Sequence, residues 1–395
     1  MTGRVCLLTR SWLADDPRVR RHGEALAAAG YDVVGVGWSG ARADQPDWPQ
    51  VTVEPPAESL PTRGRRAARL LTVRMTPQRA LSAWWADPAS TRWWDAAADV
   101  QADLYLAYDW PMLPLADRLA DTHGGGLAYD SREYGVQEHA YRATWRAVFP
   151  PYVHAVEQAL VPRAAFVTTV SAGIARLLAR DLALSEPPTV VRNVPPYQPV
   201  PDADAARGPG DPLRLLYHGL LTPGRGLEQL VTSAQGWAPG RVLTLRGHGP
   251  DGFVDALRRL AAPAGERVEL VPPVPMGELV SAAAAYDVGV MVPPGTTDHL
   301  RYSLPNKVFE YVMAGLALLV TDLPDMADLV RRYRIGALAA DATPAAIAAA
   351  VDGLDPADVA AWRAASRAAA PELSWDREQE VLVAAVRRAL SPRAR

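Results

Sequence analysis

Hydrophobic and polar positions alternate in two ways along the chain. Short apolar runs, typical of strands buried in a parallel sheet, are separated by longer Ala-, Leu- and Arg-containing stretches with helical spacing. This pattern predicts strands at residues 5–8, 32–36, 104–107, 127–129 and 166–170 in the first half. It predicts a second series at residues 213–218, 242–246, 267–271, 288–292 and 318–321. Such alternation favours an α/β fold with mostly parallel sheets.

The helical stretches and the chain length indicate two domains. Residues 18–29 form a predicted helix that Gly30 closes, and the Ala-rich residues 344–390 are expected to be helical. A stretch without periodicity, rich in Pro, Gly and Asp, indicates a linker. We therefore expect an N-terminal domain, a linker, a C-terminal domain and a last helix that could cross back onto the first domain, at residues 1–195, 196–212, 213–375 and 376–395.

Composition excludes several classes of protein. The apolar content of 49% and charged content of 22% suit a soluble globular protein, and a net charge of −3 gives no general attraction to nucleic acid. Cys6 is the single cysteine, which excludes a disulfide framework and a cysteine metal cluster. The N-terminus is typical of a first strand rather than a signal peptide, and no apolar run is long enough to span a bilayer. We expect a cytoplasmic protein.

The most informative segment surrounds the only lysine, Lys307, which follows one of two asparagines, Asn306. Pro305 suits the first turn of a short helix, with Ser303 or a residue next to it as the cap, and Gly315 suits its end. The amino end of a helix attracts phosphate, and a lysine adds a compact positive charge there. Glu310 lies one turn further on and could accept hydrogen bonds from ribose hydroxyls. The alternative is a Lys–Glu surface pair, which the apolar flanking residues disfavour.

On these residues the sequence resembles the family-4 glycosyltransferases, more narrowly those with a Pro-Asn-Lys-x-x-Glu-Tyr helix. The resemblance covers nearly the whole chain. Its other motifs are Asp16-Pro17-Arg18-Val19, Tyr108-Asp109-Trp110, Asp130-Ser131-Arg132-Glu133, Tyr217-His218-Gly219, Gly224-Arg225-Gly226, Gly247-His248-Gly249-Pro250 and Ser374-Trp375. The resemblance implies a GT-B fold, two Rossmann-like domains with parallel sheets facing across a cleft. It also implies metal-independent transfer of a sugar, with retention of configuration, from a nucleotide-diphosphate donor.

The resemblance assigns roles to individual residues. Glu310 would hold the ribose, Lys307 and Arg225 would neutralise the diphosphate, and backbone near Pro273 and Val274 would contact the base. The full donor-binding set is Gly219, Arg225, His248, Pro273, Val274, Ser303, Leu304, Pro305, Asn306, Lys307 and Glu310. The acceptor-side set is Asp16, Arg18, Asp109, Trp110, Arg132 and Glu133, and the catalytic set is Arg225, Lys307, Glu310, Arg132 and Asp109. No cofactor and no metal are expected.

Three positions depart from the family pattern. Tyr302 stands where the family has a first glutamate, and Leu220 stands where a second basic residue usually follows the glycine. Arg132 replaces a histidine, and because arginine stays charged it cannot shuttle a proton. Arg132 could clamp a phosphate or an acidic acceptor, or it could form a salt bridge with Asp130 or Glu133. Asp202 and Asp204, the only Asp-x-Asp pair, suit a solvated turn in the linker.

The donor is expected to carry UDP or GDP, and the acceptor to be a small molecule or lipid-linked. Residues 61–95 contain seven arginines, Arg63, Arg65, Arg66, Arg69, Arg74, Arg79 and Arg92, and four tryptophans, Trp84, Trp85, Trp93 and Trp94. They favour either peripheral membrane contact or, more simply, an acceptor-side loop whose tryptophans pack inside. The sequence does not determine the oligomeric state.

Two rival functions remain at this point. The glycines of Gly247-His248-Gly249-Pro250-Asp251-Gly252 match a dinucleotide-binding pattern, but they follow the second strand of their domain and include a proline in the turn. This disfavours a nicotinamide-dependent dehydrogenase. A non-catalytic sugar-nucleotide binding protein is the other alternative, and it would show neither sugar transfer nor slow donor hydrolysis.

Overall fold

The computed structural model describes residues 3–40, 44–55, 73, 76–200 and 210–391, and these form two compact units. Unit 1 comprises Met1–Arg192 and Gln379–Arg395, and unit 2 comprises Asn193–Glu378. Five of the arginines singled out near the N-terminus lie outside the described residues, as does the linker Asp-x-Asp pair: Arg63, Arg65, Arg66, Arg69, Arg74, Asp202 and Asp204.

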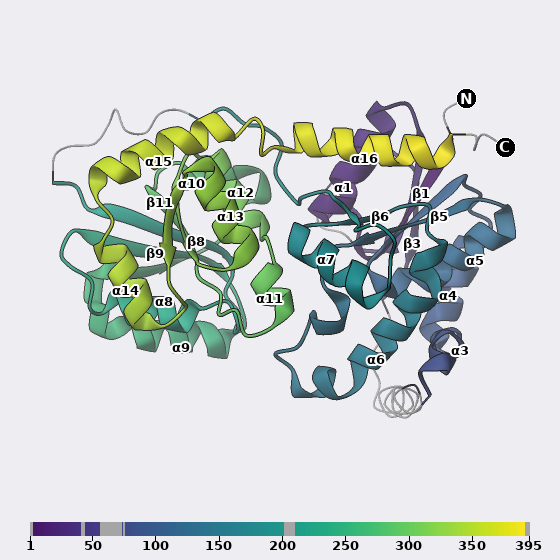
Figure 1. Ribbon diagram of the computed structural model, residues 1–395, viewed down its shortest axis with the longest axis horizontal. Helices are drawn as coiled ribbons and strands as arrows, with labels where there is room; N and C mark the ends of the chain where they lie inside the picture. The colour runs from purple at the N-terminus through teal and green to yellow at the C-terminus, as the bar shows by residue number, and fades with distance from the viewer. Residues whose placement is uncertain (1–2, 41–43, 56–72, 74–75, 201–209, 392–395) are drawn as a thin grey trace. The chain divides into compact units, whose positions relative to one another are not determined.

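Unit 1 is built on a seven-stranded parallel sheet with the order β3-β2-β1-β4-β5-β6-β7 (Figure 1). Its strands are β1 (Arg4–Trp12), β2 (Asp32–Trp38), β3 (Gln50–Val53), β4 (Leu104–Tyr108), β5 (Gly126–Ser131), β6 (Val167–Thr169) and β7 (Thr189–Val190). Its helices are α1 (Pro17–Ala28), α3 (Ala80–Trp85), α4 (Pro88–Ala97), α5 (Leu113–His123), α6 (Ala143–Leu160) and α7 (Ala172–Asp181). All five residues of the central strand β4 and five of the nine residues of its neighbour β1 are buried, which explains their continuous apolar runs.

Unit 2 repeats this plan with a six-stranded parallel sheet in the order β10-β9-β8-β11-β12-β13. Its strands are β8 (Leu213–Leu220), β9 (Arg241–His248), β10 (Val268–Val271), β11 (Val288–Met291), β12 (Ala317–Thr321) and β13 (Gly336–Ala339). Its helices are α8 (Leu227–Ala234), α9 (Asp251–Ala261), α10 (Leu279–Ala283), α11 (Asp298–Tyr302), α12 (Asn306–Met313), α13 (Pro324–Tyr333), α14 (Pro344–Asp352) and α15 (Pro356–Ala369). In both units the chain reverses its direction of travel across the sheet at the first strand, where ligands of such folds bind.

All ten predicted strands are present, but three further strands were missed. β3, β7 and β13 each lie at the edge of a sheet and have only two to four residues. An edge strand pairs on one side only, so its residues need not be apolar or alternate strictly. Gly30 follows the first helix with φ 89°, the left-handed conformation expected of a glycine there.

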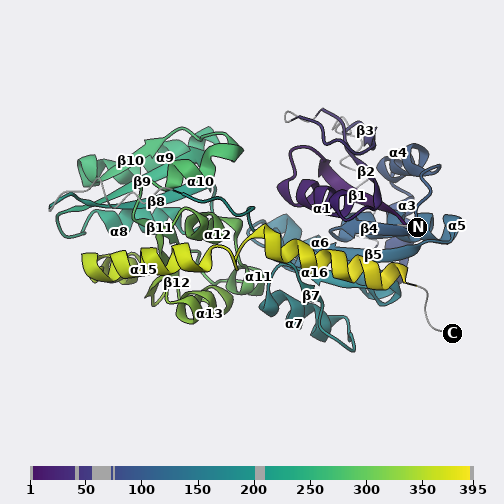
Figure 2. The same ribbon diagram turned by 90° about the horizontal axis from the view of Figure 1, so that it is seen from above.

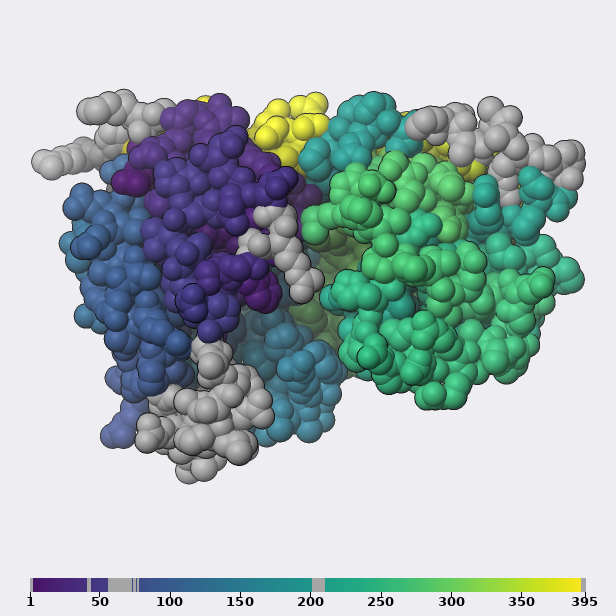
Figure 3. Space-filling model, turned by 180° about the vertical axis from the view of Figure 1, so that it is seen from behind, coloured from purple at the N-terminus to yellow at the C-terminus, as the bar shows by residue number. Residues whose placement is uncertain are grey.

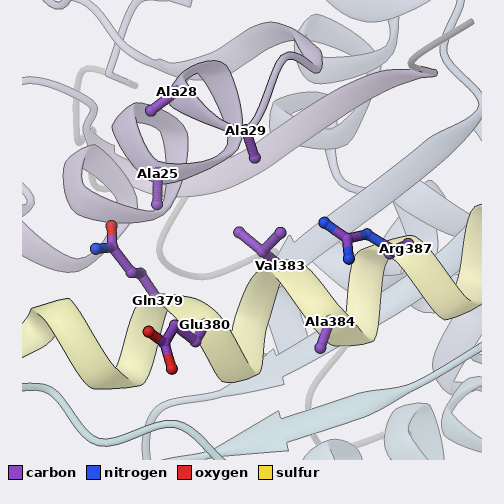
Figure 4. Close-up of a pocket in the computed structure, with 8 residues that line it drawn as sticks. All are labelled: Ala25, Ala28, Ala29, Gln379, Glu380, Val383, Ala384 and Arg387. Atoms are coloured by element: carbon purple, nitrogen blue, oxygen red, sulfur yellow. The ribbon is translucent and has the colours of Figure 1, made fainter.

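The last helix, α16 (Trp375–Leu390), belongs to unit 1 from Gln379 onward. In two perpendicular views α16 runs beside α1 (Figures 1 and 2). Ala25 of α1 and Ala29, which directly follows that helix, face Val383 of α16 across a shallow groove (Figure 4). On the face seen in Figure 3, purple N-terminal residues and blue residues near α4 and α5 form much of the surface of unit 1.

Candidate functional site

The lysine-containing helix is α12, which begins at Asn306 after the extended residue Pro305. Pro305 has φ −67° and ψ 145°, and no side chain caps the helix. Pro305 therefore occupies the N-cap position directly before the first turn in which we expected it, and the Ser303 side chain does not cap the helix. The Ser303 hydroxyl instead donates to the Leu300 carbonyl oxygen at 3.1 Å. Gly315 follows the helix with φ 72°, as predicted for its end.

Helix α12 packs against the end of strand β8 through the side chains of Lys307 and Tyr311. The Lys307 side chain crosses Gly219, where a Cβ atom would lie 2.4 Å from Lys307 Cε. Its Nζ atom lies 5.7 Å from the ring centroid of Tyr217. The hydroxyl of Tyr311 accepts a hydrogen bond from the His218 backbone N–H at 3.0 Å. Gly219 is therefore required both by its φ of 115° and by the lysine that covers it.

Lys307 lies in a cationic environment. Burial and the nearby positive charge of Arg225 lower the pKa of Lys307 to about 8, and the Glu310 carboxylate offsets this only in part. Arg225 is half-buried and its Nε donates to Thr222 Oγ1 at 2.9 Å. Two cations thus converge where the sheet of unit 2 presents the carboxyl end of its first strand. Such an arrangement suits an anion with more than one negative charge.

Glu310 contacts a residue that we did not predict as part of the site. Its Oε2 atom lies 2.8 Å from Nε2 of His218, whose side chain is 1% exposed, while the Glu310 side chain is 20% exposed. His218 belongs to the motif Tyr217-His218-Gly219, but the sequence offers no sign that its side chain meets helix α12. The Glu310 carboxylate is therefore held on one side by buried imidazole and remains accessible on another.

The other predicted donor-side residues lie near the ends of neighbouring strands. His248 is exposed at the end of β9, the strand paired with β8. Pro273 is exposed and Val274 half-buried in the loop after β10, and Leu304 is buried directly before α12. Their contacts with a base or a phosphate stay predictions.

The glycine pattern after β9 has a packing explanation. A Cβ atom at Gly247 would lie 1.8 Å from the Gly219 carbonyl oxygen, and one at Gly249 would lie 1.8 Å from the Leu221 carbonyl oxygen. Both glycines therefore allow β9 and its following loop to approach β8 closely. Close packing of β9 against β8 therefore explains these two glycines without a bound dinucleotide.

In unit 1, Arg132 joins the ends of three adjacent strands. Its Nη1 atom lies 2.5 Å from Asp16 Oδ2, and its Nε donates to Asp109 Oδ2 at 2.8 Å. Arg132 therefore pairs with Asp16 and Asp109, and it does not form the alternative salt bridge to Asp130 or Glu133. Asp16 also caps helix α1 by accepting from the backbone N–H groups of Arg18 and Val19. Asp109 has φ 60°, an uncommon conformation that stores backbone strain and is frequent at functional sites.

Two residues predicted on the acceptor side lie instead in the core. Arg18 is 1% exposed and forms a bidentate ion pair with Asp130, with Nε–Oδ2 and Nη2–Oδ1 distances of 2.6 and 2.7 Å. Trp110 is 6% exposed and its ring packs edge-on against Tyr152. An acceptor cannot reach either side chain in this arrangement, so the acceptor-side interpretation of Arg18 and Trp110 is corrected. Both residues stabilise the sheet that carries Asp109 and Arg132.

Two glutamates near this cluster were missed by sequence reasoning. Burial raises the pKa of Glu157 to about 7, and its Oε1 accepts a hydrogen bond from the Tyr129 hydroxyl at 2.7 Å. Burial, followed by repulsion from Asp109 and Glu133, raises the pKa of Glu138 to about 8. Both carboxyl groups come from segments after β5 that carry no motif, so only their positions in space bring them close to the acceptor-side residues.

The four tryptophans divide into buried and surface positions. Trp84 and Trp93 are buried, as expected if tryptophans of this region pack inside. Trp85 and Trp94 are half-buried and their rings meet edge to face, and Arg118 Cζ lies 4.5 and 4.2 Å from the two ring centroids. Among the described helices, none is long and apolar enough to cross a bilayer. Within the same residues no group of three or more His, Cys, Asp or Glu side chains is arranged to hold a metal ion.

Residues 212–354 match the family model described as "Glycosyl transferases group 1". The matched range includes Gly219, Arg225, Lys307 and Glu310. Among curated proteins, none matches the sequence.

Solved structures resemble the chain over almost its whole length. Sucrose-phosphate synthase from Thermosynechococcus elongatus has 19% identity and a TM-score of 0.74, with 97% of this chain and 98% of that one covered. Anabaena HepE in complex with UDP and glucose has 14% identity and a TM-score of 0.67, covering 98% and 99%. An α,α-trehalose 6-phosphate synthase from Burkholderia multivorans has 13% identity and a TM-score of 0.66, covering 98% of each chain. At these identities the likeness shows the fold, and it confirms the predicted GT-B class.

Proposed function

We propose that this protein is a retaining glycosyltransferase of family 4 that moves a sugar from a nucleotide-diphosphate donor to a small-molecule or lipid-linked acceptor without a metal ion. UDP and GDP are the nucleotides to test first. The UDP-glucose complex of Anabaena HepE, a protein of the same fold, favours UDP of the two. The glycosyl transferases group 1 domain of residues 212–354 supports the reaction class.

The observation that carries this proposal is the convergence of Lys307, Arg225 and Glu310 around Gly219. Two cations and one carboxylate match the two parts of a nucleoside diphosphate, because the diphosphate needs positive charge and the ribose needs an acceptor for its hydroxyls. Burial lowers the pKa of Lys307 most, and repulsion from Arg225 lowers it further. A bound diphosphate would relieve that repulsion.

The chemistry follows from these charges. In the reaction, the bond between the anomeric carbon and the β-phosphate oxygen breaks, and its electron pair stays on that oxygen. Lys307 and Arg225 stabilise the charge that develops there, the contribution that fixed cations make best in a partly buried site. The acceptor attacks the same face of the sugar, and its proton passes to the departing phosphate oxygen. Retention of configuration follows from this same-face attack.

On the acceptor side, Asp109 is the residue that we propose to position the acceptor. Arg132 holds the Asp109 carboxylate through its Nε atom. Because Asp16 engages the same guanidinium, the charge of Arg132 is compensated by two carboxylates. Arg132 therefore acts as a support for Asp109 rather than as a phosphate clamp.

Binding of UDP, GDP, dTDP and ADP, measured by thermal shift and then by calorimetry, tests the donor site. Lys307→Ala and Glu310→Ala are each expected to weaken binding by at least about tenfold, or about 1.4 kcal/mol. Arg301→Ala is the matched control, because Arg301 is an exposed cation on the preceding helix α11. Unchanged affinity in both site variants would refute the assignment.

Donor hydrolysis distinguishes the enzyme from a binding protein. A glycosyltransferase is expected to hydrolyse its nucleotide sugar slowly in the absence of acceptor, and Lys307→Ala should abolish that reaction. A protein that binds the nucleotide sugar but shows neither hydrolysis nor transfer with any acceptor would be the non-catalytic alternative.

A further inference from the structure

His218 is a buried histidine with a specific environment in unit 2. It lies on β8 directly before Gly219, and its side chain is 1% exposed. Its Nε2 atom lies 2.8 Å from Glu310 Oε2, and neither ring nitrogen meets the geometry of a hydrogen bond with any group among the residues that the structure describes. A polar ring in this position faces a single carboxylate.

The ring is held in place by tyrosine. The ring centroids of His218 and Tyr311 are 4.7 Å apart, and the His218 backbone N–H donates to the Tyr311 hydroxyl at 3.0 Å. The Tyr311 ring in turn packs where Gly289 has no side chain, since a Cβ atom there would lie 2.2 Å from Tyr311 Cγ. The imidazole therefore has little freedom to turn away from Glu310.

We propose that His218 is a positioning residue that orients the Glu310 carboxylate toward a ribose hydroxyl of the nucleotide. This inference rests on the proposed function, in which Glu310 binds the ribose. Because Nε2 lies 2.8 Å from Glu310 Oε2, the ring is within reach to donate a hydrogen bond to that oxygen once the carboxylate turns to receive it. The carboxylate is thereby fixed in one rotamer, and the protein selects ribonucleotides over deoxyribonucleotides.

Energetics favour this reading over simple packing. A buried imidazole without a partner loses its hydration, so an apolar side chain of similar size would fill the same space at a lower cost. The free-energy cost of burying the imidazole is offset by its contact with Glu310, the carboxylate that the donor site uses. A group fixed before the ligand arrives loses less conformational entropy on binding.

The test compares two isosteric replacements, His218→Gln and His218→Met. Glutamine carries an amide nitrogen four bonds from Cα, as histidine carries Nε2, while methionine has similar length and no donor. Calorimetry measures the dissociation constants of UDP, 2′-deoxy-UDP and 3′-deoxy-UDP for the wild type, both variants and Glu310→Gln. If GDP binds more tightly than UDP, the guanine series replaces the uracil series.

We expect the wild type to prefer the ribonucleotide over at least one deoxy analogue on the order of 10- to 100-fold, the range of a charge-assisted hydrogen bond. His218→Met and Glu310→Gln should each reduce this ratio to below about threefold, and His218→Gln should largely retain it. The double variant His218→Met/Glu310→Gln should lose no more of the ribonucleotide preference than either single variant. Val290→Ala, a buried truncation on the neighbouring strand β11, should lower the melting temperature and leave the ratio unchanged.

Two results would overturn the proposal, and they are distinguishable. If Glu310→Gln loses the preference for ribose while His218→Met keeps it, His218 only fills space and the donor site stands. If the wild type binds no nucleoside diphosphate, the donor site fails and the role of His218 fails with it.

Discussion

Binding of a diphosphate should become weaker as the pH rises through the pKa of Lys307. Burial and the charge of Arg225 lower that pKa from 10.5 to about 8. The site therefore holds neutral lysine over much of the alkaline range, and only the charged form can pair with phosphate. Lys307 must then take up a proton from the solvent as the nucleotide binds. The phosphates themselves do not add to this effect, since phosphate monoesters lose their second proton near pH 6.

The size of the effect follows from the pKa. If only charged Lys307 binds, affinity is proportional to its charged fraction, which is about 0.9 at pH 7 and about 0.1 at pH 9 for a pKa of about 8. The dissociation constant should therefore rise about tenfold between pH 7 and pH 9, which corresponds to about 1.4 kcal/mol. A lysine with its ordinary pKa of 10.5 would produce almost no change over that range.

Calorimetry at pH 7, 8 and 9 measures the change directly. At pH 8, titrations in two buffers with different ionisation enthalpies should report uptake of about half a proton per nucleotide. Lys307→Met retains the apolar stem and removes the charge, so its weaker binding should no longer depend on pH. A wild-type affinity that stays constant from pH 7 to pH 9 would refute the reasoning, because Lys307 would then be either fully charged or absent from the binding site.

Three further predictions concern stability and packing. Glu157→Gln keeps an oxygen that accepts the Tyr129 hydrogen bond but cannot ionise. Because folding raises the pKa of Glu157 from 4.5 to about 7, ionisation at higher pH lowers the free energy of unfolding of the wild type by up to about 3 kcal/mol. Urea unfolding should show the variant more stable than the wild type at pH 8, with the difference vanishing near pH 4.5, and equal stability at pH 8 would contradict this. Arg18→Met leaves Asp130 buried without its cation and should lower the free energy of unfolding by about 3–5 kcal/mol, whereas the exposed Arg301→Ala should change it little. Gly219→Ala places a methyl group against Lys307 at positive φ and should weaken nucleotide binding at least about tenfold. Gly210→Ala is the control, because it introduces the same backbone strain at φ 99° with no atom within 4 Å of the new methyl group and should leave nucleotide binding unchanged.

The sequence by itself determined the central part of both sheets, because a strand buried on both faces must be apolar along its length. It also determined that Lys307 and Glu310 share one face of a helix, since that follows from helical spacing alone. The edge strands β3, β7 and β13 escaped prediction because a strand that pairs on one side carries no such requirement.

Only the tertiary structure decided which charged groups meet. His218 faces Glu310, and Arg132 joins Asp16 to Asp109, although these residues are far apart along the chain. Arg18 and Arg132 look alike in the sequence, yet Arg18 is buried in the core with Asp130, whereas Arg132 is partly exposed at the carboxyl ends of the strands. Hydrophobic periodicity reports how a segment is buried, but the partner of a charge depends on the folding of distant segments onto one another.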